Sequence, residues 1–403
     1  MRKMNIPFSP PDITEAEINE VTDALRSGWI TTGPKTKKLE KKIAEWIGVL
    51  KAVCLNSNTA CAETVLRILG IGEGDEVIVP AYTYTASASV VCHVGAKLVL
   101  VDVQKDKLEM DYDALEAAIT ERTKVVVPVD LGGIPCDYDR IFEIVKGKKF
   151  LFHPNNSIQE AIGHVIIMAD CAHAFGAQWH GKMAGSIADF SNFSFHAVKN
   201  FTTAEGGAFT WKHIDGIDDE EIYHKAQLLS LHGQSKDALA KTQLGAWEYD
   251  IVGTWYKCNM TDVAAAMGLA QFERYESIMA RRKEIILRYD AAFKPLDVKV
   301  LNHYTEEYTG SGHLYITNIP GVTSEQRNEI ITKMAERGVA CNVHYKPLPM
   351  HTAYKEMGFD IKDYPNAYEW FKNEITLPLH TKLNDEEVRY VIAQYTEILD
   401  AYI

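Results

Sequence analysis

The segment Phe193–Gly207 (FSFHAVKNFTTAEGG) carries the pattern on which the fold prediction depends. Its lysine, Lys199, follows the apolar run Phe190–Phe195, and both this run and Gly207–Trp211 are predicted strands. Small, aromatic and hydroxyl residues surround the lysine. Most lysines are exposed loop residues, but a lysine in an apolar setting has a lowered pKa and can form a Schiff base. Lys199 is therefore a candidate nucleophile, with an exposed loop lysine as the alternative.

Similar short apolar runs alternate with helix-length segments along the chain. The predicted strands are Ala52–Leu55, Glu76–Pro80, Lys97–Val103, Val125–Val129, Val165–Ala169, Phe190–Phe195 and Gly207–Trp211. Several of them are apolar throughout, as is typical of strands that helices cover on both faces. The alternation predicts an α/β fold with a mostly parallel sheet.

The pattern changes in the C-terminal third. From Thr261 to Tyr289 the spacing of apolar residues is helical, and a predicted strand at His313–Ile319 and a predicted helix at Ser324–Arg337 follow. We therefore predict a large α/β domain over residues 1–270, with an N-terminal helical segment. Residues 271–403 form a connecting helix and a small α+β domain. The segment His153–His164, with its Pro-Asn-Asn-Ser turn, is predicted to be a surface insertion.

Composition and charge exclude several classes of protein. The 403 residues include 42 basic and 55 acidic side chains, a net charge of −13, which disfavours general nucleic-acid binding. No segment reaches the roughly 18 apolar residues of a membrane-spanning helix, and the N-terminus lacks a signal-peptide pattern. The seven cysteines are scattered, without a Cys-x-x-Cys pair, which is typical of reduced thiols. We expect a cytoplasmic protein without nucleic-acid or membrane partners.

Two further segments supply partners for Lys199. Asp170 ends the run Val165–Ala169, at the edge where α/β folds bind ligands. There a carboxylate can hold the pyridine nitrogen of pyridoxal phosphate (PLP) protonated, although a helix N-cap is the alternative. The segment Leu55–Ala60 (LNSNTA) joins a strand to a helix predicted at Ala62–Leu69. Its backbone N–H groups would bind a phosphate, and simple capping explains its polar residues equally well.

Metal binding and cysteine catalysis are competing interpretations. Five potential metal ligands lie within one segment of the chain, namely His153, His164, Cys171, His173 and His180. Their spacing lacks the short ligand pairs of zinc sites, so we predict no metal site. Cys171 lies too close to His173 along the chain for a nucleophile–base geometry to be assumed.

Five segments in order resemble one protein family. They are Ser27–Lys35 (SGWITTGPK), Met168–Gly176 (MADCAHAFG), Phe193–Gly207, Trp255–Asp262 (WYKCNMTD) and Val343–Pro347 (VHYKP). Together they resemble the DegT/DnrJ/StrS family of PLP-dependent nucleotide-sugar aminotransferases over nearly the whole chain. The resemblance implies the aspartate-aminotransferase fold (fold type I), usually in a homodimer whose active sites lie at the interface.

The resemblance also implies roles for individual residues. Lys199 corresponds to the Schiff-base lysine, and Asp170 to the partner of the pyridine nitrogen. The other implied cofactor contacts are Tyr84 on the ring, His173 near the cofactor, Thr59, Ala60 and Ser194 at the phosphate, and Asn259 reaching the phosphate from the neighbouring subunit. Positions near the substrate are Thr31, Thr32, His344 and Tyr345.

The expected activity is the transfer of an amino group from L-glutamate to a nucleotide-linked keto-sugar. The resemblance favours C4 of a UDP-linked 4-keto sugar and a place in polysaccharide, lipopolysaccharide or glycan biosynthesis. Two alternatives share the fold, a PLP-dependent sugar dehydratase and a PLP-binding regulatory protein. The dehydratases carry histidine at the lysine position, so Lys199 argues against them. The His153–His164 insertion has no counterpart in the family and could change an edge near the sugar.

Overall fold

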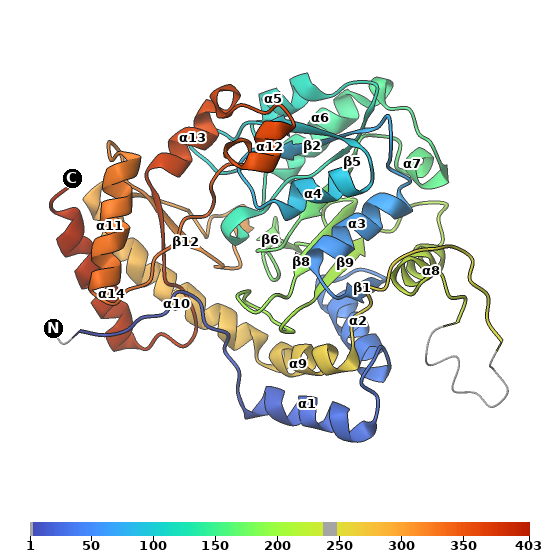
Figure 1. Cartoon of the computed structure of the whole chain (residues 1–403), viewed down its shortest axis with the longest axis horizontal. Coiled ribbons are helices and arrows are strands. Elements are labelled where there is room, and N and C mark those ends of the chain that lie inside the picture. The colour runs from blue at the N-terminus through green and yellow to red at the C-terminus, as the bar shows by residue number, and fades with distance from the viewer. Residues whose placement is uncertain (1–2, 237–247) are drawn as a thin grey trace.

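A seven-stranded sheet lies at the centre of the computed structural model, which describes residues 3–236 and 248–403 (Figure 1). Its strand order is β1-β9-β8-β5-β4-β2-β3. The strands are β1 (Ala52–Leu55), β2 (Glu76–Pro80), β3 (Lys97–Val101), β4 (Thr123–Val126), β5 (Ile166–Asp170), β8 (Phe190–Ser194) and β9 (Gly207–Trp211). Strand β9 is antiparallel to both of its neighbours, and the pairs from β8 to β3 are parallel. The predicted α/β class is confirmed.

Helices connect the strands and continue through the C-terminal part. They are α1 (Glu15–Ser27), α2 (Pro34–Ile47), α3 (Asn58–Ile68), α4 (Ala86–His93), α5 (Tyr112–Ala118), α6 (Tyr138–Gly147), α7 (Ser157–Ile162), α8 (Asp219–Ser230), α9 (Asp262–Glu273), α10 (Tyr275–Phe293), α11 (Ser324–Glu336), α12 (Thr352–Glu356), α13 (Pro365–Lys372) and α14 (Asp385–Leu399). Two small sheets complete the fold. One consists of β10 (Lys299–Val300), β12 (Tyr315–Asn318) and β13 (Glu374–Leu377), and the other of β11 (Tyr308–Thr309), β6 (Gln178–Trp179) and β7 (Lys182–Met183).

The central strands lie where the apolar runs predicted them, with shifts at their ends. Strand β4 ends at Val126, whereas the prediction extended it to Val129. Pro128 explains the early end, because proline has no N–H group to offer a neighbouring strand. Strand β5 includes Asp170, so the carboxylate lies at the carboxyl edge of the sheet as predicted.

Helix α3 begins four residues earlier than predicted, at Asn58 instead of Ala62. Ser57 is its N-cap, and its Oγ accepts a hydrogen bond from Ala60 N at 3.0 Å. A serine in this position satisfies one of the N–H groups that a helix start leaves free. The polar residues after β1 therefore form the first helical turn and not a loop before it.

The segment His153–His164 lies mostly at the surface and bends at Asn155 and Asn156, as predicted, but it also forms a helix. Its second half forms helix α7, and the side chain of Gln159 is fully buried. The side-chain amides of Asn156 and Gln159 each donate a hydrogen bond to Leu69 O, both at 2.7 Å. These bonds satisfy the C-terminal end of α3. Ser57 and the cavity described below are at the opposite end of α3, and the expectation that this segment shapes an edge near the sugar stays a prediction.

The C-terminal elements pack around a second hydrophobic core. This core joins α10, α11 and α14 with the β10-β12-β13 sheet, and Ile6 from the N-terminal segment belongs to it. Figure 1 shows α10 extending from α9, next to α1, towards α11 and α14. Residues 348–370, by contrast, contribute Leu348 and Trp370 to the core of the central sheet. The division after residue 270 stays a prediction.

Helices α1, α2 and α9 pack against one another, and one buried carboxylate organises the turn before α2. Asp262, the first residue of α9, accepts hydrogen bonds from Gly33 N at 2.8 Å, Lys35 N at 2.9 Å and both N and Oγ1 of Thr36 at 2.9 and 2.7 Å. The N-terminus of α2 has no side-chain cap of its own, and Asp262 takes that place. This arrangement holds Thr31 and Thr32 against the segment before α9.

Candidate active site

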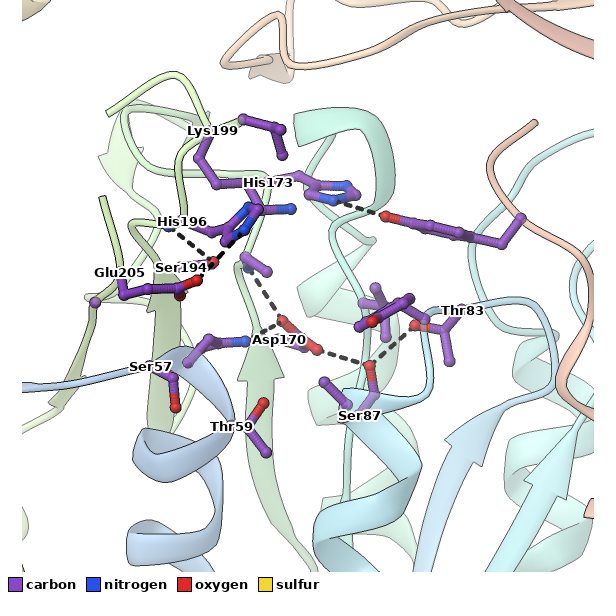
Figure 2. Close-up of a pocket in the computed structure, with 18 residues that line it drawn as sticks. Ser57, Thr59, Thr83, Ser87, Asp170, His173, Ser194, His196, Lys199 and Glu205 are labelled. Carbon is purple, nitrogen blue, oxygen red and sulfur yellow. Dashed lines mark hydrogen bonds and ion pairs between the residues drawn. The ribbon is translucent and has the colours of Figure 1, made fainter. Parts of the chain in front are cut away.

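A cavity of about 400 Å³ lies at the carboxyl ends of β5 and β8, beside the start of α3 and α4 (Figure 2). Open α/β sheets bind ligands at this edge because the connecting loops splay apart there. Seven of the residues predicted from the sequence line the cavity together: Thr59, Tyr84, Asp170, His173, Ser194, Lys199 and Tyr345.

Asp170 is the most firmly held of these residues. It is buried, and its carboxylate accepts hydrogen bonds from Ser87 Oγ at 2.7 Å, Ala172 N at 3.1 Å and Asn58 Nδ2 at 3.3 Å. Figure 2 shows Asp170 above the end of its strand, with Ser87 and the start of α3 on either side. Three donors from three elements hold one orientation of the carboxylate. Such a group can bind a cationic nitrogen presented in the cavity.

Lys199 lies in the loop between β8 and β9, where Lys199 N donates to His196 O at 2.9 Å. Burial lowers the pKa of Lys199 to about 8, although the charge of Asp170 opposes this effect. No hydrogen bond or ion pair joins its Nζ to another residue in the part of the chain that the structure describes. An amine with a pKa near neutrality is partly unprotonated and can act as a nucleophile or a base.

The end of the cavity at the first turn of α3 is suited to bind an anion. Thr59 and Ala60 lie in the first turn of α3, where backbone N–H groups have no intrahelical acceptor and the helix dipole is positive. Ser194 ends β8 beside this turn, and Gly207 begins β9. A Cβ atom on Gly207 would lie 2.6 Å from Asn58 N, so only glycine lets the strand approach this loop so closely. Helix N-termini with such close backbone approach commonly bind phosphate groups.

His173 and two tyrosines form a further wall. Gly132 N donates to His173 Nδ1 at 3.2 Å, and His173 Nε2 lies 3.2 Å from the hydroxyl of Tyr345. Burial lowers the pKa of His173 well below its ordinary value, and the charges of Lys199 and His344 add to this effect. The Tyr84 ring, which is 60% exposed, lies 5.8 Å from the Tyr345 ring. Tyr84 therefore has one ring face open to a ligand.

Five predicted residues do not line the cavity. Ala60 lies next to it in α3, and His344 lies behind the cavity wall. There the ring of His344 stacks on Phe8 at 5.5 Å between centroids, and burial lowers its pKa to about 3 with a further contribution from Lys199. The other three, Thr31, Thr32 and Asn259, form a separate group.

This separate group lies around the segment before α9. Asn259 Nδ2 donates to Thr32 Oγ1 at 2.5 Å, Thr32 Oγ1 donates to Met260 O at 2.6 Å, and Asp262 N donates to Thr31 O at 2.9 Å. Lys257 Nζ also donates to Asn259 Oδ1. Within one chain these residues therefore have no direct contact with the cavity.

The structure adds lining residues that the sequence did not single out. Ser87 and Asn58 bind Asp170 directly, and Thr83 lies 2.9 Å from Ser87, oxygen to oxygen. His196 and Glu205 also line the cavity, with His196 Nε2 3.6 Å from Glu205 Oε1. Asn58 had a signal in the sequence as part of the segment Leu55–Ala60, and His196 and Glu205 lie in the segment Phe193–Gly207. The role of Ser87 depends on the packing of α4 beside β5, which no local pattern reveals.

The residues present fit pyridoxal phosphate. The cavity combines an amine with a lowered pKa, a buried carboxylate and a helix N-terminus that Gly207 keeps free of side-chain atoms. These groups match an aldehyde, a pyridine nitrogen and a phosphate, which are the three functional ends of that cofactor. In the described residues, no three histidine, cysteine, aspartate or glutamate side chains gather in a way that could hold a metal ion.

Comparisons of the sequence agree with this fit. A model of the DegT/DnrJ/EryC1/StrS aminotransferase family matches residues 11–396. The chain is 37% identical to the spore coat polysaccharide biosynthesis protein SpsC of Bacillus subtilis, over 98% of this chain and 97% of that protein. It is 34% identical to the UDP-4-amino-4-deoxy-L-arabinose–oxoglutarate aminotransferase of Shewanella sediminis, over 98% of each chain.

Solved structures give the same result. Spr1654 of Streptococcus pneumoniae, a proposed sugar aminotransferase, matches with a TM-score of 0.97 and 59% identity in its PMP form, over 99% of this chain and 100% of that chain. Its PLP form matches with a TM-score of 0.96 and 57% identity, also over 99% and 100%. Among the residues described here, no helix is long and apolar enough to span a membrane.

Proposed function

Because the chain belongs to the DegT/DnrJ/EryC1/StrS aminotransferase family, and is a PLP-dependent sugar aminotransferase, we propose that it aminates the ketone of a nucleotide-linked sugar with L-glutamate as the donor. The observation that carries the proposal is the meeting of Lys199 and Asp170 in one cavity that also contains an anion-binding helix start. When bound there, pyridoxal phosphate supplies an electron sink for bonds at the amino carbon.

We propose catalytic roles for two side chains. Lys199 holds the cofactor through its Nζ atom and, when that amine is free, takes a proton from Cα of the donor and returns one to the product. Its lowered pKa supports this role, because an amine that titrates near neutral pH is efficient in both directions. Asp170 binds the ring nitrogen, and the three hydrogen bonds from Ser87, Ala172 and Asn58 support its orientation.

The remaining predicted residues receive binding roles in the same proposal. Thr59, Ala60 and Ser194 bind the phosphate, Tyr84 stacks on the ring, and His173 contacts the cofactor from the side. His344 and Tyr345 face the substrate side, with Tyr345 at the cavity surface and His344 behind it. Offset stacking on the open face of Tyr84 is the arrangement that aromatic rings prefer.

A homodimer with shared active sites would explain the residues outside the cavity. Asn259, Thr31 and Thr32 form one group that does not line the chain's own cavity, and Asn259 is buried and pairs with Leu55, two residues before the lining residue Ser57. The proposal brings this group of one protomer to the cavity of its partner, where Asn259 would bind the phosphate. Exposed side chains in the same region, including Trp255 and Tyr256, favour burial against another molecule.

The substrate proposed is a UDP-linked 4-keto sugar. The Shewanella relative is named for UDP-4-amino-4-deoxy-L-arabinose and oxoglutarate, and the Bacillus relative for spore coat polysaccharide biosynthesis. These names support a UDP-linked sugar, glutamate as the donor and a role in polysaccharide or lipopolysaccharide biosynthesis. All seven cysteines are free, which supports a cytoplasmic setting.

The test begins with the donor. Protein loaded with pyridoxal phosphate should lose its visible absorption band when L-glutamate is added, and 2-oxoglutarate should appear. Lys199→Ala should show neither change, whereas Lys37→Ala, a substitution outside the cavity, should behave as the wild type does. A panel of UDP-4-keto sugars, a pentose and a 6-deoxy-N-acetylhexosamine, should then restore the band and yield the amino sugar. Full turnover by Lys199→Ala, or no response to glutamate in the wild type, would contradict the proposal.

A further inference from the structure

The hydrogen bonds of His173 define which of its ring nitrogens carries the proton. Gly132 N donates to Nδ1 at 3.2 Å, and a backbone N–H group can only donate. Nδ1 must therefore present its lone pair. The ring is buried and faces Lys199, His344 and His313, and burial lowers its pKa, so the imidazole is neutral. In a neutral ring the single proton then lies on Nε2.

A second histidine, His313, packs beside His173 and carries its proton on the other ring nitrogen. The ring of His313 packs 4.3 Å from that of His173, and its Nδ1 lies 2.9 Å from Asn200 Oδ1. This atom of Asn200 is the oxygen, because Arg282 Nε donates to it at 2.8 Å while Asn200 Nδ2 donates to Ser311 O at 2.9 Å. His313 therefore carries its proton on Nδ1.

The proton position on His173 determines the direction of the Tyr345 hydroxyl. His173 Nε2–H donates to the Tyr345 oxygen across 3.2 Å, which makes Tyr345 the acceptor in this bond. Burial raises the pKa of Tyr345, so the hydroxyl keeps its own proton. That proton is left to donate to another acceptor, and Tyr345 lines the cavity.

The backbone of this tyrosine is also held firmly. The carbonyl of His344 accepts from Tyr82 Oη at 2.9 Å, and His344 N donates to the buried carboxylate of Glu374 at 3.0 Å. These bonds hold the peptide unit before Tyr345, whose hydroxyl lies beside His173 in the cavity wall.

We propose that Tyr345 donates a hydrogen bond to the carbonyl oxygen of the sugar substrate, and that Gly132 and His173 direct its hydroxyl proton into the cavity. The inference rests on the proposed function. Negative charge develops on a ketone oxygen when nitrogen adds to the carbonyl carbon, and a donor held in advance at that oxygen stabilises the transition state. The donor half-reaction forms a ketone only in its last step, the release of 2-oxoglutarate, so the earlier steps with L-glutamate do not need this bond.

The first test measures the two tautomers directly. Protein with ¹⁵N-labelled histidine, loaded with pyridoxal phosphate, should give a proton-free Nδ1 for His173 and a protonated Nδ1 for His313. Spectra of His173→Gln and His313→Gln assign the two signals. A proton on Nδ1 of His173 would overturn the proposal without reference to any substrate.

The second test separates the steps that involve a ketone oxygen from those that do not. In Tyr345→Phe, the loss of the visible band on addition of L-glutamate should stay within about twofold of the wild-type rate, whereas the reaction with the UDP-4-keto sugar should be about 10- to 100-fold slower. Tyr308→Phe is the matched control, because it also loses one hydroxyl hydrogen bond, to Asn302 O, but outside this cavity. An equal slowing of the band loss and of the sugar reaction, or no loss with the sugar, would refute the role of Tyr345. If the wild type accepts no UDP-4-keto sugar, the proposed substrate fails together with this role.

Discussion

The side chains of Lys199 and Asp170 differ in the hydrogen bonds that they make. Asp170 receives three hydrogen bonds, whereas Lys199 Nζ makes none to the described residues. The carboxylate is thus held in one orientation, and the amine is left free to react. Burial moves the pKa of Lys199 down to about 8, within reach of neutral pH.

This lowered pKa predicts a specific reactivity in protein freed of cofactor. Acetylation of Lys199 by acetic anhydride should rise with pH around a midpoint near 8, because only the unprotonated amine reacts. An exposed lysine has an ordinary pKa near 10.4, so its acetylation rises about two pH units later. Peptide mass spectrometry across a pH series measures the acetylation of Lys199 and of the exposed lysines. A midpoint for Lys199 in the range of exposed lysines would contradict the burial described here.

A second residue prediction concerns Glu374, which lies buried behind the cavity wall. Burial raises its pKa to about 8, although hydrogen bonds from Thr376 and His344 N and the charge of Arg327 favour the anion. Between about pH 4.5 and 8 the folded protein holds a proton that the unfolded chain has lost. The stability that this proton provides is present near pH 5 and is lost as the pH rises towards 8.

Glu374→Gln has no titrating carboxyl group at this position, so the unfolding free energy of the variant should depend less on pH. Relative to the variant, the wild type should lose up to about 1.4 kcal/mol of unfolding free energy per pH unit across this window. Urea unfolding of both proteins at several pH values measures the trend. Parallel curves for the two proteins would show that Glu374 is ionised in the folded state.

At the scale of the elements, the sequence predicts strand positions well and some helix boundaries less well. Strands β1, β2 and β9 coincide with the apolar runs because strands that are buried along their whole length contain few polar residues. The start of α3 was missed because Ser57 and Asn58 are compatible with a loop and with a capped helix turn. The packing of α7 against Leu69 depends on long-range hydrogen bonds that no local pattern contains.

The same distinction applies to the site. Asp170 and Lys199 each follow a buried strand, so their place at one edge could be predicted. The contacts of Ser87 and Asn58 with Asp170 could not, since they depend on how α4 and α3 approach β5. For Asn259, Thr31 and Thr32, the sequence gives motif positions, and their proposed partner lies in another chain.

Asp262 provides a prediction about two elements at once. Its carboxylate satisfies four donors of the turn Gly33–Thr36 and is almost completely buried. Asp262→Ala should lower the unfolding free energy by about 3 kcal/mol or more, because each buried donor left without an acceptor costs about 1–3 kcal/mol. Asp262→Asn keeps one oxygen and should lose less. Urea unfolding measures both, and an unchanged midpoint for the alanine variant would contradict this account.

At the scale of the whole molecule, the proposed role of Asn259 in the partner's site predicts complementation between chains. Lys199→Ala and Asn259→Ala should each be inactive or weak alone. If Asn259 acts in the partner's site, a mixed dimer contains one intact site and one site with both substitutions. After random reassociation of equal amounts, about one quarter of all sites should be active.

The measurement is the L-glutamate half-reaction of the two variants before and after they are mixed under conditions that exchange subunits. The control is each variant taken alone through the same subunit-exchange conditions. Without any gain on mixing, Asn259 acts within its own chain or the protein is not a dimer, and gel filtration distinguishes these two cases.

The close contact at Gly207 also limits how this chain can change during evolution. The first atom of any side chain would meet the backbone of Ser57 and Asn58 at 2.6 Å, so even alanine collides there. Only glycine is compatible with this position while the loop and the strand keep their contact. The next residues of the same strand, Ala208 and Phe209, and its last residue, Trp211, all carry side chains, so the restriction is local to Gly207. Descendants that differ at most other positions should keep this glycine. One that has replaced it should have rebuilt the anion-binding loop or lost its use.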